Sequence, residues 1–216
     1  RPELLQAFSA EVYGRTPAAR VAMRVRQAAP DKVLFGGKGV MSQTTLEFVA
    51  PTGRRAEAAL LLILPTAAPT KPAPVFVNLN FGGNHSVSHD PDILLSEAWF
   101  RDKETAGYVN HRATPASRGS GAAGYPLEAM LDRGHGLATA CYGDFDPDVD
   151  DGFRNGIHAL FPRAASGPAA GSEWGAIGAW AWGLGRMADH LLTLPQVDGK
   201  KLVAVGHSRL GKAALW

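Results

Sequence analysis

Ser208 lies near the carboxyl end of the sequence, in a context that favours nucleophilic chemistry. Residues 202–205 form an apolar run typical of a buried parallel strand, and Ser208 follows two residues after Gly206. The Ala- and Leu-rich residues that come next predict the beginning of a helix. A serine on a sharp strand-to-helix turn exposes its hydroxyl at the end of a sheet, as the nucleophile of an α/β-hydrolase does. The pattern therefore predicts Ser208 as a nucleophile, with a serine that only caps the helix as the alternative.

The partners that such a serine requires do not follow it in this sequence. A serine hydroxyl reacts well only when a base removes its proton. In α/β-hydrolases the acid and the histidine come after the nucleophile, whereas all seven histidines here precede Ser208. We predict that His207, next to the serine, packs beneath the turn. The catalytic acid and histidine are therefore expected on a carboxy-terminal remainder of the same enzyme.

Arg209 and Lys212 accompany the serine on the predicted helix. The backbone N–H of Arg209 stands where the first donor of an oxyanion hole belongs. A cation at a helix N-terminus is locally unfavourable, which favours a functional reason for Arg209 over a plain surface arginine. Lys212 lies one helical turn after Ser208 and on the same face. By spacing alone, a solvated helix lysine remains the alternative for Lys212.

A glycine-rich turn follows another predicted strand. Residues 75–80 are mostly apolar, and Phe81, Gly82, Gly83 and Asn84 come directly after them. This position corresponds to the loop that carries the second oxyanion donor of α/β-hydrolases. We expect the turn to shape the site or to donate an N–H, the alternative being an ordinary glycine turn.

The segment Gly206-His-Ser-Arg-Leu-Gly-Lys212 resembles the Gly-x-Ser-Arg-x-Gly-Lys motif of the glucuronoyl esterases, carbohydrate esterase family 15. Other stretches similar to its bacterial members are Pro2-Glu-Leu-Leu5, Glu11-Val-Tyr-Gly-Arg15, Asn80-Phe-Gly-Gly-Asn-His85, Tyr142-Gly-Asp-Phe-Asp-Pro-Asp148, Asp150-Asp-Gly-Phe153 and residues 174–182. The resemblance thus covers most of the chain. It implies a serine esterase that needs no cofactor and no metal, and that cleaves esters between xylan 4-O-methyl-glucuronate and lignin alcohols.

The same resemblance implies roles for two of the residues. The guanidinium of Arg209 would stabilise the oxyanion of the tetrahedral intermediate. Lys212 would hydrogen-bond the hydroxyls of the glucuronate ring. One alternative is a polysaccharide deacetylase similar to acetyl xylan esterases, against which Lys212 argues, because an acetyl group offers no sugar hydroxyls on the acyl side. The other is a non-catalytic relic that binds carbohydrate.

The composition limits the size of the domain and the classes of partner that the protein could have. The 216 residues are 45% hydrophobic, enough for one globular domain, and 22 basic residues against 20 acidic ones leave a net charge of +2. This balance favours neither nucleic acid nor a membrane surface as a partner, and no apolar run approaches the ~20 residues of a membrane span. The single cysteine, Cys141, is predicted to be buried and cannot form a disulfide within the chain. The chain begins with Arg1 rather than Met, which fits a processed protein or a trimmed sequence. We expect a secreted or periplasmic enzyme that is monomeric when complete.

The order of predicted elements indicates an α/β fold. Strands are expected at 44–49, 58–64, 75–80, 137–142 and 202–205, and helices at 2–14, 126–133 and 174–194; loops are expected at 67–74, 101–124, 144–151 and 161–172. The alternation of strands and helices predicts a three-layer α/β-hydrolase fold with a mostly parallel central sheet and right-handed crossovers. Residues 1–216 would be a single domain of this kind, holding its first part and incomplete at the carboxyl end.

The acidic loop 144–151 invites a calcium interpretation. Counted from Asp144, Val149 and Asn155 stand where an EF-hand requires glycine and glutamate, so the pattern fails. We predict instead that its carboxylates accept loop N–H bonds or pair with Arg154 or Arg163. The tryptophans at 174, 180 and 182 are predicted to pack in the core.

Overall fold

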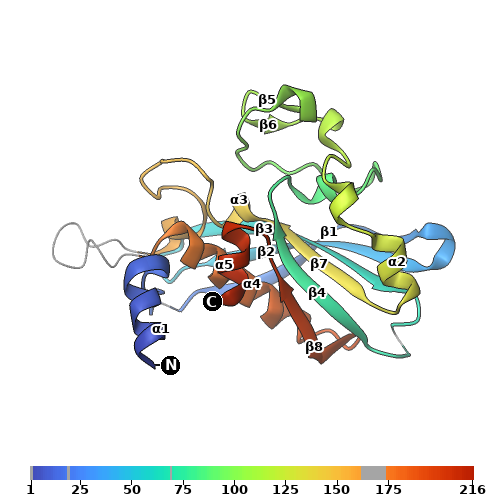
Figure 1. Cartoon of the computed structure of the whole chain (residues 1–216), viewed down its shortest axis with the longest axis horizontal. Helices are drawn as coiled ribbons and strands as arrows, with labels where there is room; N and C mark the ends of the chain where they lie inside the picture. The colour runs from blue at the N-terminus through green and yellow to red at the C-terminus, as the bar shows by residue number, and fades with distance from the viewer. Residues whose placement is uncertain (1, 19, 69, 162–173) are drawn as a thin grey trace.

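A six-stranded sheet with helices on both faces forms the body of the protein (Figure 1). The computed structural model describes residues 2–18, 20–68, 70–161 and 174–216. The sheet strands, in spatial order, are β1 Ala22–Leu34, β2 Gly39–Val49, β3 Arg55–Pro65, β7 Gly136–Cys141, β4 Ala73–Asn80 and β8 Val197–Val205. The other elements are α1 Pro2–Phe8, β5 Tyr108–Val109, β6 Arg112–Ala113, α2 Leu127–Asp132, α3 Tyr142–Phe145, α4 Ala176–Leu191 and α5 Arg209–Leu215.

Alternation along β3 shows how the layers form. Leu60, Leu62 and Leu64 point into one core, which also contains the buried faces of α4 and α5. Leu61 and Ile63 point into a second core on the opposite face, under α2. Because successive side chains of a strand point to opposite faces, one continuous apolar run can fill both cores. The predicted three-layer arrangement is confirmed.

The sheet is mixed. The pairs β1–β2, β2–β3 and β3–β7 are antiparallel, whereas β7–β4 and β4–β8 are parallel. The two parallel pairings bring the carboxyl ends of β4, β7 and β8 to the same edge. The glycine-rich turn, α3 and the Ser208 turn therefore emerge side by side, at the edge where open α/β sheets bind ligands. The excursion that carries β5 and β6 stands beyond the end of β4 (Figure 1).

Most predicted elements exist, with shifted ends. The N-terminal helix is α1, prolonged by a π-helical turn, Ser9–Tyr13, and closed by Gly14 at φ 71°. The strand predicted at 44–49 begins at Gly39, and the helix predicted from Trp174 begins at Ala176. From residue 162 on, the loop expected at 161–172 lies outside the described residues.

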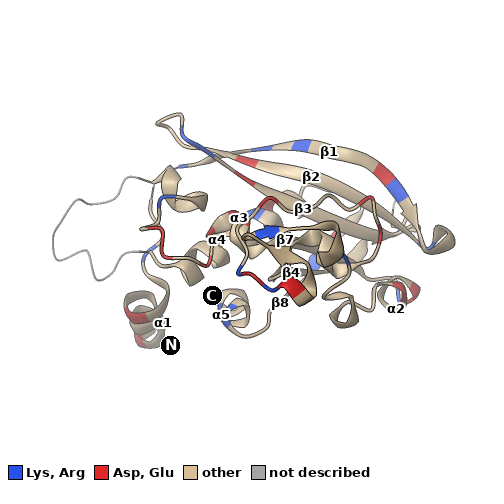
Figure 2. Cartoon of the chain, turned by 90° about the horizontal axis from the view of Figure 1, so that it is seen from above, with Lys and Arg blue, Asp and Glu red and all other residues tan. Residues whose placement is uncertain are grey.

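The strand β1 was not predicted. It is the edge strand opposite β8, most of its 13 residues are exposed, and charged residues of both signs lie along it (Figure 2). Its partners are distant in sequence, since Arg24 pairs with Glu47 and Arg26 with Glu57. A strand with little buried surface gives little apolar periodicity, which is the signal that predicts strands.

The core predictions hold for the residues that the structure describes. Trp174 and Trp180 are buried, and Trp182 packs partly buried against them. Cys141 is a free, buried thiol at the end of β7, and burial raises its pKa. Among the described residues, no helix has the length and apolar character needed to cross a bilayer.

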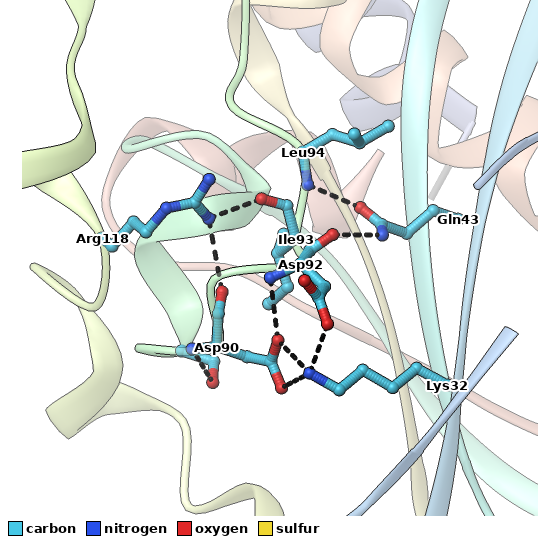
Figure 3. Close-up of polar contacts among 8 residues, drawn as sticks. Lys32, Gln43, Asp90, Asp92, Ile93, Leu94 and Arg118 are labelled. Carbon is cyan, nitrogen blue, oxygen red and sulfur yellow. Dashed lines mark hydrogen bonds and ion pairs between the residues drawn. The ribbon is translucent and has the colours of Figure 1, made fainter. Parts of the chain in front are cut away.

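A polar network fastens residues 90–94, in the loop after the glycine-rich turn, to β1 and β2 (Figure 3). Lys32 Nζ lies 2.8 Å from Asp90 Oδ1 and 2.6 Å from Asp92 Oδ2. The carboxamide of Gln43, which is 5% exposed, donates to the carbonyl of Asp92 and accepts the backbone N–H two residues further on. Arg118 donates to the carbonyl of Asp90 from the other side. The antiparallel strands thus hold the loop that follows the glycine-rich turn.

Candidate active site

The turn at Ser208 has an unusual backbone. Ser208 lies at φ 56° and ψ −127°, a left-handed conformation that residues other than glycine rarely adopt. A Cβ on Gly206 would lie 2.2 Å from the carbonyl oxygen of Leu210, and one on Gly211 would lie 3.2 Å from the carbonyl oxygen of Gly206. The two glycines therefore let the start of α5 fold back closely on the end of β8. Strained conformations of this kind occur preferentially at functional sites.

Arg209 is held in one orientation beside this turn. Its two terminal nitrogens lie 2.8 Å from Asp148 Oδ1 and 2.7 Å from Asp148 Oδ2, a bidentate ion pair. The guanidinium carbon is 5.6 Å from the ring centre of Phe81 and 5.8 Å from that of Trp180. Aromatic faces attract a cation at this separation. The structure thus brings together Arg209 and Phe81, which lie on separate parts of the sequence.

Tyr142 completes the surroundings of Arg209. Its ring packs edge-to-face against Phe81 and Trp180, with 5.2 Å between ring centres in both pairs. Its hydroxyl reaches Asp148 at 3.4 Å. Burial and the charge of Asp148 raise the pKa of Tyr142, so its hydroxyl stays protonated and donates to the carboxylate. Five segments, which carry Phe81, Tyr142, Asp148, Trp180 and Arg209, therefore converge at this point.

The glycine-rich turn is tightly packed. Gly83 has φ 81°, and a Cβ on Gly82 would lie 2.6 Å from Ser86 Oγ and 2.7 Å from the hydroxyl of Tyr108. The same hydroxyl donates to the carbonyl of Gly82 at 2.8 Å. Any larger residue at 82 would displace these side chains, so the two glycines set the path of the loop.

The side chain of Asn84 forms hydrogen bonds that hold this loop in place. It is 6% exposed, its amide donates to the carbonyl of Ala59 at 2.8 Å, and its oxygen accepts from Asn80 at 2.9 Å. Its side chain is therefore committed to shaping the loop. Within the described ranges, the backbone N–H groups of Gly82, Gly83 and Arg209 donate to no protein acceptor.

A cavity of about 490 Å³ joins these residues. Phe81, Gly82, Asp148 and Arg209 line it together with Tyr108 of the excursion. The polar groups at its wall and the unpaired backbone donors make it suitable for a ligand oxygen that carries negative charge.

Ser208 and Lys212 are not among the lining residues of this cavity, and both are exposed. The backbone of Lys212 is fixed, since its N–H donates to the carbonyl of Ser208 and its carbonyl accepts from the hydroxyl of Tyr13. Its side chain projects from the same helix face as the serine, one turn on.

The prediction for His207 is wrong. His207 is exposed rather than packed beneath the turn, because β8 is the outermost strand of the described sheet and nothing described covers that side. His85 and His158 are buried in networks of their own. His85 Nε2 contacts Ser117 Oγ at 2.7 Å, and His158 Nδ1 lies 2.7 Å from Asp146 Oδ2. No hydrogen bond joins a described histidine to Ser208.

Comparisons with known proteins agree on one group. A curated carbohydrate esterase from an unknown prokaryotic organism is 36% identical over 219 residues, which cover the whole chain and 49% of that protein. A promiscuous CE15 esterase from a marine bacterial metagenome superposes with a TM-score of 0.85 at 34% identity, over 100% of this chain and 53% of the other. A glucuronoyl esterase from Solibacter usitatus gives a TM-score of 0.83 at 38% identity, with the same coverage. A scan against protein-family models finds no match.

Over its whole length the chain is similar to esterases of carbohydrate esterase family 15. It has the α/β-hydrolase fold of those structures and spans about half the length of the relatives that it matches. The resemblance inferred from the Ser-Arg-x-Gly-Lys segment is thereby confirmed.

The acidic loop 144–151 has partners that the sequence prediction missed. Loop N–H bonds occur as predicted, since Asp150 accepts from Gly152 and Asp151 from Arg154. The ion pair, however, joins Asp148 to Arg209 rather than to the side chain of Arg154. Arg163, the other predicted partner, lies outside the described residues. Asp148 and Arg209 are 61 positions apart, so no local pattern could have indicated their contact.

Proposed function

We propose that the protein is a serine esterase that hydrolyses glucuronoyl esters, those that link 4-O-methyl-glucuronate of xylan to lignin alcohols. The observation that carries the proposal is the left-handed Ser208 at the end of a parallel strand, followed directly by an arginine that an aromatic and carboxylate pocket holds in place. The similarity to the glucuronoyl esterase from Solibacter usitatus supports the choice of substrate.

In the proposed reaction, Ser208 Oγ attacks the carbonyl carbon of the uronoyl ester. The carbonyl oxygen becomes a tetrahedral oxyanion, and collapse of the intermediate expels the lignin alcohol and leaves an acyl-enzyme. Water then attacks the acyl-enzyme and releases the uronate. The Arg209 guanidinium and the unpaired N–H groups beside it would stabilise the oxyanion, a contribution of roughly 3 kcal/mol per donor in similar sites.

The proton transfers require a histidine and an acid. We assign both to the carboxy-terminal remainder of the same enzyme, because α/β-hydrolases place them after the nucleophile. Serine chemistry of this kind uses no cofactor. Lys212, exposed one turn after Ser208, would position the sugar through its ring hydroxyls.

The proposed substrate class also suggests where the enzyme acts. Glucuronoxylan and lignin lie outside the microbial cell, so the enzyme would be secreted or periplasmic, and it would act as a monomer. Neither nucleic acid nor a membrane is proposed as a partner.

The decisive experiment compares ester substrates on the full-length gene product. Turnover of methyl glucuronate and of acetylated xylan would be measured for the wild type, for Ser208→Ala and for Ser42→Ala, a partly exposed serine on the distant strand β2. We expect turnover of the glucuronate ester that Ser208→Ala abolishes and Ser42→Ala leaves unchanged. Turnover of the acetyl ester alone would instead identify a deacetylase, and glucuronate binding without hydrolysis would identify a carbohydrate-binding relic.

A further inference from the structure

Asp148 lies in bidentate contact with the arginine that follows the proposed nucleophile, and this contact has a consequence for product release. We propose that Asp148 keeps the free carboxylate product off Arg209, so that the site holds a neutral ester in preference to the uronate that the ester becomes. This proposal rests on the proposed function, because it takes a uronate to be the product.

The geometry divides the donors of Arg209 into two groups. A guanidinium carries five N–H donors. Asp148 Oδ1 and Oδ2 lie 2.8 Å and 2.7 Å from the two terminal nitrogens, so the end of the fork faces this carboxylate. The Nε–H and the remaining N–H bonds stay available. Arg209 can therefore donate to a single oxyanion oxygen while the end of its fork is closed to a second carboxylate.

The substrate and the product differ in charge. The ester is neutral, and its oxyanion exists only transiently on one oxygen, where backbone N–H groups also serve it. The uronate product carries a permanent negative charge shared by two oxygens at neutral pH. An unpaired arginine beside the nucleophile would bind such a carboxylate through two parallel hydrogen bonds. Asp148 occupies the end-on form of that arrangement, and its charge opposes a second carboxylate at the side-on pair formed by Nε–H and a terminal N–H.

Several contacts hold the ion pair between Asp148 and Arg209 in place. The side chain of Asp148 is 22% exposed and that of Arg209 is 42% exposed, so solvent reaches the pair only in part. The rings of Phe81 and Trp180 lie near the guanidinium, and Tyr142 donates to the carboxylate. Because these contacts fix both partners, Asp148 stays in place when a ligand arrives, unlike the partner in an ordinary surface ion pair.

The test measures binding of two ligands that differ in the charge of one carboxyl group, which is free in one and methylated in the other. In the full-length gene product carrying Ser208→Ala, which prevents turnover, calorimetry would give the Kd of sodium glucuronate and of methyl glucuronate. Asp148→Asn removes the charge and keeps the shape. Asp150→Asn, in the same loop, is the matched control, since its carboxylate accepts the backbone N–H of Gly152. Arg209→Gln combined with Asp148→Asn tests whether the guanidinium mediates the effect.

We expect Asp148→Asn to bind glucuronate about tenfold more tightly, which corresponds to about 1.4 kcal/mol, and to change the Kd of the methyl ester less than about threefold. Asp150→Asn should change neither, and Arg209→Gln should abolish the gain. With Ser208 restored, the inhibition constant of glucuronate should fall by the same factor.

The proposal is overturned if glucuronate binding stays constant or weakens in Asp148→Asn, or if both ligands gain equally. Asp148→Ser, which also removes the charge, decides the matter should Asp148→Asn fail to fold. A purely structural role for Asp148 would lower the melting temperature and weaken both ligands together. If the wild type cleaves no glucuronoyl ester while Asp148→Asn still gains affinity for glucuronate, the proposed function fails and the role of Asp148 stands.

Discussion

At the scale of single residues, Arg209 owes its orientation to side chains that the sequence does not connect. Asp148 fixes the end of its guanidinium, and Phe81 and Trp180 lie beside it. An ammonium group could not copy this arrangement, because a lysine has no planar fork.

Arg209→Lys tests whether this geometry matters for turnover. We expect kcat for methyl glucuronate to fall about 100-fold, since a lysine would lose the fixed donor near the oxyanion, while the melting temperature changes little. Steady-state kinetics of the full-length gene product measure the effect. A variant that keeps more than about a third of the wild-type kcat would exclude the guanidinium from the reaction.

A second prediction concerns His85, which is fully buried behind the glycine-rich turn. Ser96 N–H donates to its Nδ1, so Nε2 carries the proton and donates to Ser117. Burial and the nearby charge of Arg118 lower the pKa of His85 from 6.5 to about 4. Between these two pH values the unfolded chain takes up a proton at His85 and the folded chain does not. Stability is therefore lost as pH falls through this window.

We expect this histidine to cost the wild type up to about 3 kcal/mol between pH 6.5 and pH 4. His85→Gln can keep both hydrogen bonds and does not titrate, so its pH dependence should be flatter by that amount. Urea unfolding at half-unit pH steps gives the comparison. Parallel pH profiles for the two proteins would show that His85 takes up a proton in the folded state as readily as in the unfolded one.

The sequence predicted individual chemical groups and missed their partners. The predictions for Ser208, Arg209 and the glycine-rich turn rest on a local signal, because each of them follows an apolar strand. The contact between Arg209 and Asp148 depends on where two loops end in space, and no residue type near either one indicates it. Asn84 shows the same limit, because only the structure reveals that its amide is bonded to Asn80 and Ala59.

At the scale of elements, the junction of β8 and α5 depends on a missing side chain. A Cβ at Gly206 would lie 2.2 Å from a backbone oxygen of α5, which cannot move aside as a side-chain end could. Gly206→Ala should therefore cost about 2 kcal/mol or more of unfolding free energy and abolish turnover.

Gly185→Ala is the matched control for this prediction. Gly185 lies inside α4 with no atom within 4 Å of a Cβ built there. The alanine should stabilise the helix by about 0.5–1 kcal/mol. Urea unfolding of both variants provides the test, and equal effects of the two substitutions would show that the junction relaxes freely.

The attachment of residues 90–94 is a second property of the elements. Gln43 is nearly buried and serves two backbone groups of this loop, whereas the side chain of Lys32 is 35% exposed (Figure 3). Gln43→Leu should cost about 2 kcal/mol, because it leaves both backbone groups without partners. Lys32→Met should cost less than about 1 kcal/mol.

Hydrogen exchange adds a local measurement to these two variants. Amide protection in residues 90–94 should fall in Gln43→Leu and persist in Lys32→Met. Equal losses of stability and protection would mean that the ion pair, rather than the buried carboxamide, holds the loop.

The strands show which elements sequence patterns can predict. The strand β3 contains a continuous apolar run because it contributes to two cores, and the prediction at 58–64 covers that run but not the first three residues of the strand. The strand β1 exposes most of its residues and is held by backbone pairing to β2 and by ion pairs with distant acidic residues. Backbone pairing leaves no mark on residue type, so β1 was invisible in the sequence.

At the scale of the whole molecule, the parallel and antiparallel strands contribute differently. The parallel strands β7, β4 and β8 bring the glycine-rich turn, α3 and the Ser208 turn to one edge, and the antiparallel strands β1 and β2 hold the loop that follows the glycine-rich turn. The fold class followed from the alternation of strands and helices. That alternation does not predict the support that β1 and β2 give to the loop, because the support depends on contacts between residues about 50 positions apart.

The backbone of Ser208 also has a consequence for the stability of the whole protein. A left-handed residue other than glycine costs about 1–3 kcal/mol, and glycine at 208 would relieve it at an entropic cost of about 0.5–1 kcal/mol. We expect Ser208→Gly to raise the melting temperature by about 2–4 °C, and Ser208→Ala, which keeps a Cβ, to leave it unchanged. Calorimetry of the three proteins would decide, and an equal melting temperature for all three would mean that the turn holds no strain.

Selection for stability and selection for activity therefore oppose each other at position 208. Under the proposed function, every change from serine to glycine at 208 would yield a more stable and inactive protein. Under the proposed function the serine would persist only where the reaction matters to the organism, so its loss would be an early sign that a lineage no longer uses the enzyme.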